Sequence, residues 1–247
     1  MTEAIRPHPV LAAHYPSLEA RSDFVRTLFN RTAGDYDRIN RLFSLGAGSR
    51  YRRVALQRAG LARGARVLDV AVGTGLVARE AVALVGDPAL VTGLDLTENM
   101  LAIARAGLGI HAVQGRAEAL PVAAASIDFL SMGYALRHVP DLREAFGEFR
   151  RVLRPGGTVL LLEIGRPDRR WAQMLARAYL GGVVPAMCRL LRPDREAARL
   201  MRYCWDTIDT CVPPPTILGA LAAAGFEHPR CETTCGVFRA YTGQAPG

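Results

Sequence analysis

The fold is decided by Val67-Leu68-Asp69-Val70-Ala71-Val72-Gly73-Thr74-Gly75, an apolar run with one acid that leads into a tight turn of small residues. A helical pattern begins directly after the turn and covers residues 76–85. Glycine at positions 73 and 75 lets the backbone bend sharply and leaves room for a ligand to lie against it. Strand, turn and helix in this order predict a nucleotide-type cofactor on a doubly wound α/β sheet.

A second acid, Asp95, closes the next apolar run, Leu90-Val91-Thr92-Gly93-Leu94. A carboxylate in this place can accept hydrogen bonds from both hydroxyls of a ribose, as it does in NAD sites. The first turn does not complete the Gly-x-Gly-x-x-Gly pattern of dinucleotide sites, because Ala78 occupies the last position. Without a pyrophosphate to hold, the turn can instead bind an amino-acid-like group.

Composition limits the class of protein. The chain has 247 residues, half of them hydrophobic, which suits one domain with a modest appendage. Its net charge is +8 and every basic residue is Arg. This surplus permits an anionic membrane surface as a partner, whereas the sparse aromatics, not interleaved with the arginines, argue against nucleic acid. No apolar run approaches the ~20 residues that span a bilayer, and residues 1–18 lack the layout of a signal peptide. With an odd count of five cysteines, we expect reduced thiols, no metal site and a cytoplasmic protein.

Periodicity divides the chain into five parts. We expect a flexible lead-in at 1–21, a helical lid at 22–62, a cofactor-binding α/β core at 63–165, a helical substrate cap at 166–212 and the end of the core sheet at 213–247. Three lid helices are predicted. The first begins at Ser22, which can act as its N-terminal capping residue, and the other two cover 36–43 and 51–61. Core strands are predicted at 66–71, 90–95, 110–114, 127–132 and 158–163, with helices at 75–86, 98–107 and 141–153.

The last third is less regular. Pro155-Gly156-Gly157 predicts a turn before the fifth strand, and the Arg-rich stretch that follows Glu163 is broken by Gly181-Gly182. A cap helix is expected to start at Pro193. A last helix over 216–224 and two strands over about 226–242 complete a seven-stranded sheet.

Four segments together resemble the S-adenosylmethionine site of class I methyltransferases. They are the first turn, Asp95, the loop Gln114-Gly115-Arg116-Ala117-Glu118-Ala119-Leu120-Pro121, and Leu153-Arg154-Pro155-Gly156-Gly157 before an apolar strand. The resemblance implies the Rossmann-like fold of that class, with the helical lid ahead of the sheet and the helical insertion before its last two strands. It also implies S-adenosylmethionine as cofactor.

A narrower resemblance is to the ubiquinone/menaquinone C-methyltransferase family. It is carried by Phe29-x-x-x-Ala33-x-x-Tyr36-Asp37-x-x-Asn40-x-Leu42-x-Ser44-x-Gly46, followed by Arg53, and by Ala135-Leu136-Arg137-His138-Val139. This implies C-methylation of a quinol or quinol-like aromatic ring, such as a prenylated benzoquinol or naphthoquinol. Three departures, Val72, Gly48 and His138, stand where the family has other residues, and the last two lie where substrate is expected.

Site roles follow from the resemblance, position by position. The residues that it assigns to the cofactor are Asp69, Ala71, Gly73, Thr74, Gly75, Asp95, Leu96, Met100, Arg116, Ala117, Glu118 and Gly133. Substrate-wall candidates are Tyr36, Asn40, Tyr134, Tyr203 and Trp205. Of these, Tyr134 could instead simply pack, and Tyr203 and Trp205 could equally be core residues. Arg137 matches the family arginine at the reacting quinol, and a guanidinium suits phenolate stabilisation better than base catalysis. His138 ranks second, as a base of suitable pKa.

Competing interpretations remain at this stage. A natural-product O-, N- or C-methyltransferase would keep the cofactor and change the acceptor, and a non-catalytic scaffold in quinone biosynthesis would keep only the fold. An NAD oxidoreductase of the Tyr-Lys type is excluded, because the chain has no Lys. The arginines of 166–202 form either a solvated face or a basic, partly apolar cap that rests on the inner face of an anionic membrane. Homodimer formation stays open.

Overall fold

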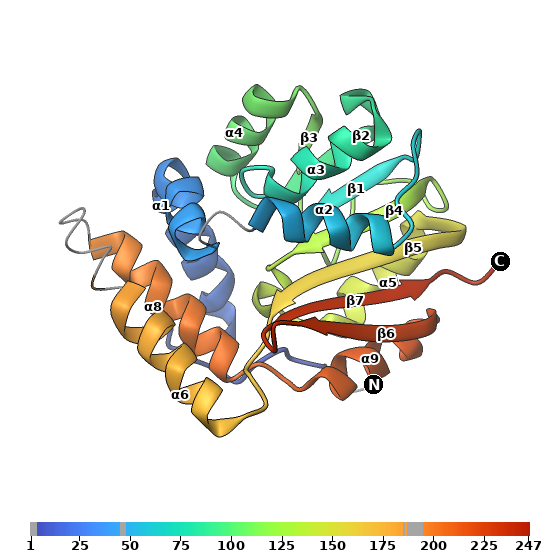
Figure 1. Cartoon of the computed structure of the whole chain (residues 1–247). Coiled ribbons are helices and arrows are strands. Elements are labelled where there is room, and N and C mark those ends of the chain that lie inside the picture. The colour runs from blue at the N-terminus through green and yellow to red at the C-terminus, as the bar shows by residue number, and fades with distance from the viewer. Residues whose placement is uncertain (1–3, 45–47, 185, 187–194) are drawn as a thin grey trace.

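The computed structural model describes residues 4–44, 48–184, 186 and 195–247. Its centre is a seven-stranded sheet in the order β3-β2-β1-β4-β5-β7-β6 (Figure 1). The strands are β1 (Val67–Val70), β2 (Val91–Asp95), β3 (His111–Gln114), β4 (Ile127–Gly133), β5 (Leu153–Ile164), β6 (Glu227–Thr234) and β7 (Phe238–Gln244). The first five are parallel, and β7 is antiparallel to both of its neighbours. The predicted fold class is confirmed.

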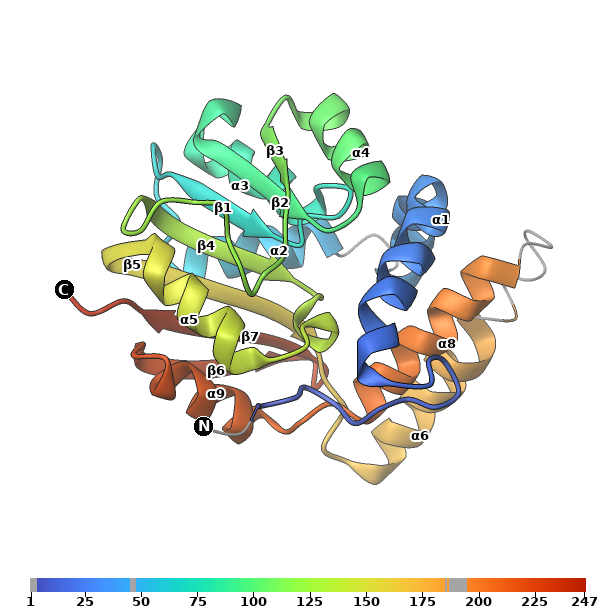
Figure 2. The same cartoon turned by 180° about the vertical axis from the view of Figure 1, so that it is seen from behind.

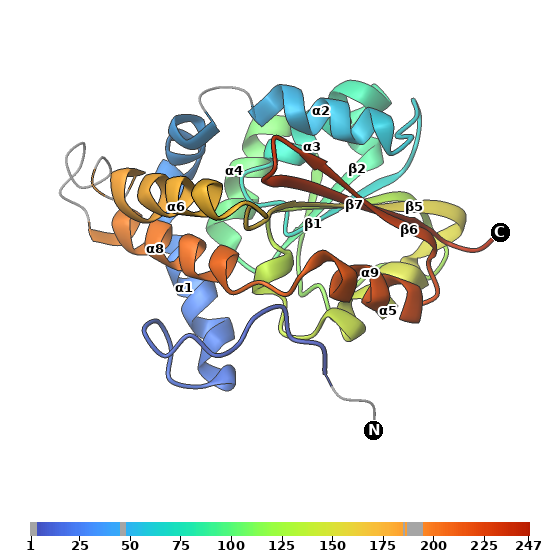
Figure 3. The ribbon, with the colours of Figure 1, turned by 60° about the horizontal axis from the view of Figure 1, so that its bottom comes forward.

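Helices cover both faces of the sheet. α2 (Gly48–Arg58), α3 (Leu76–Val85) and α4 (Glu98–Leu108) pack on one face, and α5 (Leu142–Val152) and α9 (Pro214–Ala223) pack on the other (Figure 3). The central strand β1 is buried along its whole length, as expected for a parallel strand between two helical layers. The strand order reverses between β1 and β4. A ligand crevice is therefore expected at the carboxyl ends of these two strands.

The lid is simpler than predicted. Residues 18–44 form one continuous helix, α1 (Leu18–Ser44), which passes through Gly34 without a break. The prediction of a cap at Ser22 and of two separate helices is wrong here, because packing against the rest of the molecule overrides local propensity. The hydroxyl of Ser17 accepts a hydrogen bond from the Ala20 N–H at the start of the helix.

The expected flexible lead-in is packed from residue 4 onward. Ile5 N–H donates to Asp141 Oδ1, and Leu142 N–H donates to the Ile5 carbonyl, so this segment is held at the start of α5. Further along, Val212 N–H donates to the Pro7 carbonyl. The segment also buries Tyr15 between α1 and α8 (Arg195–Asp209). Sequence periodicity misses such a segment, because it is held by contacts with distant parts of the chain.

The predicted turn at Pro155-Gly156-Gly157 lies inside a strand. β5 begins at Leu153, and its pairing with β4 shifts register so that Ile127 faces Leu153 while Phe129 already faces Thr158. Gly156 has φ +76°, a conformation that favours glycine. The glycine pair therefore forms a bulge that lets the strand bend without ending.

The cap consists of α6 (Arg170–Ala178), a short π-helical turn (Tyr179–Val183) and α8, and we use "cap" for this segment below. α8 lies against the lid helix α1 beyond the carboxyl ends of β1 and β4 (Figures 1 and 2). The predicted helix start at Pro193 lies outside the described residues. No helix in the described part of the chain is long and apolar enough to cross a membrane.

Candidate functional site

The turn after β1 is built for close approach of a ligand. Ala71, Gly73 and Gly75 have φ values of +55°, +57° and +89°. At Gly75 the positive φ strains any other residue, and an added Cβ would also lie 2.6 Å from the end of the Leu108 side chain, so glycine is favoured there. A Cβ on Gly73 would meet nothing within 4 Å, which leaves its backbone open to a ligand. The turn is anchored by Gly73 N–H, which donates to Asp95 Oδ2 at 2.8 Å.

The two acids predicted to bind the cofactor lie at the ends of neighbouring strands. Asp69 is buried, and its Oδ1 accepts from the Ser131 hydroxyl at 2.6 Å. Its Oδ2 is buried with no partner among the described residues. Burial raises the pKa of Asp69 to about 7 and also raises the pKa of Asp95. Asp95 Oδ1 accepts from both the N–H and the hydroxyl of Thr97. Asp95, which lines the adjacent cavity, thus keeps acceptor capacity for a ligand, whereas Asp69 is buried beneath the turn.

A first cavity runs along the turn and the strand ends. Of the predicted cofactor residues, its walls include Ala71, Gly73, Asp95, Leu96, Met100, Arg116, Ala117, Glu118 and Gly133. Three do not line it: Asp69, Thr74 and Gly75 lie behind the wall. The Thr74 hydroxyl donates to Asp37 Oδ1 of α1, so it ties the lid to the turn. Arg116 pairs with Glu118 across the loop at 3.4 Å.

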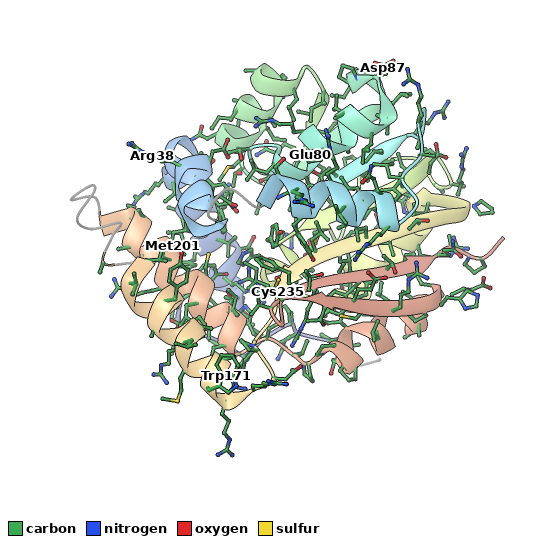
Figure 4. The ribbon with its side chains drawn as sticks, in the orientation of Figure 1. Arg38, Glu80, Asp87, Trp171, Met201 and Cys235 are labelled. Carbon is green, nitrogen blue, oxygen red and sulfur yellow. The ribbon has the colours of Figure 1, made fainter. Side chains whose placement is uncertain are left out.

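A second, mostly apolar cavity of about 730 Å³ lies between the lid, the cap and the ends of β5 and β7. It shares four lining residues with the first cavity: Phe29, Tyr36, Tyr134 and His138. The two cavities therefore meet at these side chains, and we call this place the junction. Of the predicted substrate-wall residues, Tyr36, Asn40, Tyr134 and Trp205 line the second cavity. Figure 4 labels three more of its lining residues, Trp171 on α6, Met201 on α8 and Cys235 at the β6–β7 turn.

Arg137 lines the second cavity, but its guanidinium is already engaged. Its Nε lies 2.6 Å from Glu163 Oε2, and its Nη1 donates to the Thr207 hydroxyl at 2.6 Å and to the Cys204 carbonyl at 3.1 Å. Both members of the ion pair are nearly fully buried, at 3% and 4% exposed. Burial by itself would lower the pKa of Arg137, but the attraction and the hydrogen bond of Glu163, together with Cys204, raise it. These contacts join β5 to α8. Because Glu163 compensates the positive charge of Arg137, this arginine attracts an anionic ligand only weakly.

His138 lies at the junction and is held by Tyr203. Its Nδ1 is 3.0 Å from the Tyr203 hydroxyl, and the two rings stack with centroids 5.3 Å apart. Burial first, and then the charge of Arg137, lower the pKa of His138 well below its ordinary value. Tyr203 itself is fully buried and lines neither cavity, so its prediction as a substrate-wall residue does not fit the structure. The ring packs in a cluster with Tyr15 and Leu28 instead.

Sequence reasoning missed several lining residues. Arg52 of α2 lines the second cavity, although only its neighbour Arg53 belongs to the quoted motif. Arg21, Ser22 and Val25 of α1 line the first cavity. Their helical spacing was visible, but nothing in the sequence says which face of a lid helix turns toward a ligand.

Known proteins resemble this chain over most of its length. The model of the ubiE/COQ5 methyltransferase family matches residues 17–244. A ubiquinone/menaquinone biosynthesis C-methyltransferase of Syntrophotalea carbinolica is 36% identical over 88% of this chain and 92% of its own. The corresponding enzyme of Shewanella sediminis is 32% identical over 87% and 88%.

Solved structures share the fold at lower identity. An S-adenosylmethionine-dependent methyltransferase of Thermotoga maritima superposes with a TM-score of 0.64 at 19% identity, covering 89% of this chain and 99% of its own. Phosphoethanolamine N-methyltransferase 2 of Haemonchus contortus gives 0.60 at 16% identity, over 96% of this chain and 61% of its own. These two likenesses establish the architecture.

Proposed function

Because the chain belongs to the ubiE/COQ5 methyltransferase family, we propose that it transfers a methyl group from S-adenosylmethionine to a ring carbon of a quinol-type acceptor. The observation that carries the proposal is the junction, where the cavity at the strand ends, which contains Asp95 and Glu118, shares its lining with a large, mostly apolar one. Such a pair of cavities suits a small polar donor and an aromatic acceptor with an apolar tail. No observation favours the natural-product alternative.

The first cavity fits the cofactor. Asp95 would accept from the ribose hydroxyls, while the open backbone at Gly73 suits the amino-acid end. Arg116 and Ala117 would border the adenine, and Gly133 the bottom of the cavity. When bound, S-adenosylmethionine supplies an electrophilic methyl group on a sulfonium centre.

The junction residues hold the acceptor and exclude water. Tyr36 and Tyr134 come from the lid and from the end of β4, and burial keeps both hydroxyls protonated by raising their pKa. A dry site favours a reaction in which opposite charges are consumed, because no ordered water has to be removed at that moment. His138 has too low a pKa to take a proton readily, so we assign it hydrogen bonding to the acceptor. We assign Arg137 a structural role, in which its contacts with Glu163 and Thr207 keep the cap in place against the core.

The lid and the cap enclose the acceptor cavity. α1 and α2 close it on one side through the Asp37–Thr74 hydrogen bond and the Arg53–Glu80 ion pair. Figure 4 shows Glu80 on α3, facing α2. The cap closes the other side. We propose that these two segments open to admit the acceptor.

The cap also carries an apolar stripe that suits the cytoplasmic surface of an anionic membrane. Its exposed side chains are Trp171, Met174, Leu175, Tyr179 and Val183, which recur at helical spacing. The exposed Arg169, Arg170 and Arg177 lie on the same helical segment. Apolar side chains flanked by arginines favour insertion at an anionic lipid surface. Trp171 and Leu175 also line the acceptor cavity, so a lipid-borne acceptor would reach it from this face.

The proposal is tested in two steps. Calorimetry with S-adenosylmethionine, with NADH as control, measures cofactor binding, and mass spectrometry after incubation with a short-chain demethylquinol measures carbon methylation. Binding with a mass gain of one methyl group on the ring supports the function. Binding without transfer to the quinol would leave a methyltransferase with another acceptor, and no binding at all would contradict the proposal.

A further inference from the structure

Arg52 is a buried cation in the wall of the acceptor cavity. The residue is 5% exposed and lies in the first half of α2, where its side chain faces the second cavity. Its Nη2 donates to Asn40 Oδ1 at 3.0 Å, and its Cζ lies 5.6 Å from the centre of the Tyr134 ring. Its Nε is buried without a hydrogen-bond partner among the described residues.

No carboxylate in the described part of the chain pairs with Arg52, in contrast to Arg137, whose charge is matched by Glu163. Its polar neighbours are neutral. Asn40 carries no charge, and burial raises the pKa of Tyr134 to about 12 and raises that of Tyr36 further. Of the carboxyls, Asp69 senses the charge of Arg52, but more weakly than it senses burial and the Ser131 hydroxyl.

An unpaired buried charge is costly, because the interior solvates it poorly and removal of a partner from a buried pair costs several kcal/mol. A guanidinium at the wall of a ligand cavity that has no carboxylate partner among the described residues therefore favours an anionic group on the ligand. The apolar surroundings strengthen that attraction, since low-dielectric walls screen it less than water does. Contacts with Asn40 and with the Tyr134 ring fix the orientation of the Arg52 guanidinium.

We propose that Arg52, and not Arg137, binds the ionised hydroxyl oxygen of the acceptor, and so selects acceptors that carry an acidic ring hydroxyl beside the methylated carbon. The inference rests on the proposed function for the identity of the acceptor. The hydroxyl proton leaves to bulk water before the lid and the cap close, and the negative charge that remains on the oxygen faces the guanidinium. An opposite charge within 4–6 Å lowers the pKa of such a group by about 1 to 3 units, which raises the reactive fraction accordingly.

A chromophoric phenol reports this effect directly. 4-Nitrophenol becomes yellow on ionisation, so absorbance against pH gives the apparent pKa of the bound probe. We expect the wild type to lower it by about 1 unit or more, and Arg52→Gln to abolish the shift. Arg50→Gln, an exposed position on the same helix, is the matched control and should behave as the wild type does. A shift of equal size in Arg52→Gln would overturn the proposal.

Kinetics with the short-chain demethylquinol give a second readout. Arg52→Gln should lower kcat about 10-fold or more and move its pH profile to higher pH, while the Kd for S-adenosylmethionine stays unchanged. Arg52→Lys, which keeps the charge, should recover part of the rate and serves if Arg52→Gln does not fold. An unshifted pH profile with a normal cofactor Kd would contradict the role of Arg52. A wild type that does not methylate the quinol would instead contradict the proposed function, and the phenol titration would still decide the inference.

Discussion

At the scale of single residues, the role of a side chain at this site depends on its partners in the fold and not on its position in a sequence motif. Arg137 and Arg52 both line the acceptor cavity, yet one is neutralised by Glu163 and the other has no carboxylate partner in the described residues. Charge alone therefore does not identify the arginine that meets the acceptor. The difference comes from partners on other elements.

The first prediction at this scale concerns the Arg137–Glu163 pair. Glu163→Gln should lower the free energy of unfolding by about 3–5 kcal/mol, because it leaves a buried guanidinium uncompensated. The double variant Arg137→Gln/Glu163→Gln should cost clearly less than the sum of the two single changes. Urea unfolding measures all three. Glu148→Gln, in the more exposed pair with Arg151, is the control and should cost no more than about 1 kcal/mol. Additive single effects would show that the pair is not coupled.

Asp95 offers a test of the cofactor site. Asp95→Asn should weaken S-adenosylmethionine binding about 10- to 100-fold, because hydrogen bonds to a charged group contribute about 1.5–3 kcal/mol. The same change also loosens the turn, since Gly73 N–H loses a charged acceptor. Asp87→Asn removes an exposed carboxylate that, among the described residues, accepts only from Ala89 N–H. Calorimetry should find the affinity of this variant for S-adenosylmethionine unchanged. An Asp95→Asn protein that binds like the wild type would place the ribose elsewhere.

At the scale of elements, the site depends on which helices are brought over the strand ends. The sheet supplies the acids and the turn. Of the four junction residues, Phe29 and Tyr36 lie on the lid helix α1, whereas Tyr134 and His138 lie in the segment that follows β4. The cap adds an apolar wall that is also the most exposed apolar surface among the described helices. One segment thus lines the acceptor cavity and faces solvent.

The cap stripe predicts a lipid-dependent association. Met174→Ser/Val183→Ser changes two exposed side chains that do not line the cavity. This variant should bind phosphatidylglycerol vesicles several-fold more weakly than the wild type in co-sedimentation, because each inserted apolar side chain contributes about 1 kcal/mol or more. Wild-type binding should also weaken in phosphatidylcholine vesicles, which lack the anionic charge.

Val10→Ser is the matched control, because Val10 is an exposed apolar residue outside the cap. It should sediment with vesicles as the wild type does. Equal loss in both variants would argue against a specific face. If the stripe instead joins two copies of the chain, sedimentation velocity without lipid would show a dimer that Met174→Ser/Val183→Ser dissociates.

For the molecule as a whole, the sequence predicted what local geometry determines. The turn at 73–75 follows from glycines with positive φ, and the five parallel strands follow from short apolar runs with turns between them. It did not predict what distant contacts determine. α1 continues through Gly34 because the helix packs on the cap, and β5 absorbs its glycines as a bulge because both neighbouring strands hold it. For the same reason the sequence did not show that Tyr203 is buried in the core or that Arg52 lines the acceptor cavity, since burial and partners are properties of the folded chain.

The free energy of unfolding should therefore depend on pH where long-range contacts bury a titratable group. His8 is such a group, and its contribution can be measured separately by mutation. His8 is buried at 1% exposed, with Nδ1 2.7 Å from the Pro9 carbonyl and Nε2 3.0 Å from Arg21 Nη2. Burial, and then the charge of Arg21, lower its pKa from 6.5 to about 4. Between these values the unfolded chain binds a proton that the folded chain does not. The contribution of His8 to stability is thus complete above pH 6.5 and is lost as the pH falls toward 4.

Replacement of His8 by Gln keeps a hydrogen-bond acceptor for Arg21 and removes the titration. The wild type should lose more stability than His8→Gln between pH 6.5 and 4, by at most about 3 kcal/mol, since one pKa unit corresponds to 1.36 kcal/mol. Asp69 acts in the opposite direction, because its pKa is raised and protonation at low pH favours the fold, but both proteins share it and the difference cancels it. Urea unfolding at several pH values measures how the free energy of unfolding of each protein changes with pH. His111→Gln, at an exposed position of β3, is the control. Parallel curves for wild type and His8→Gln would mean that the N-terminal segment does not hold His8 neutral against Arg21.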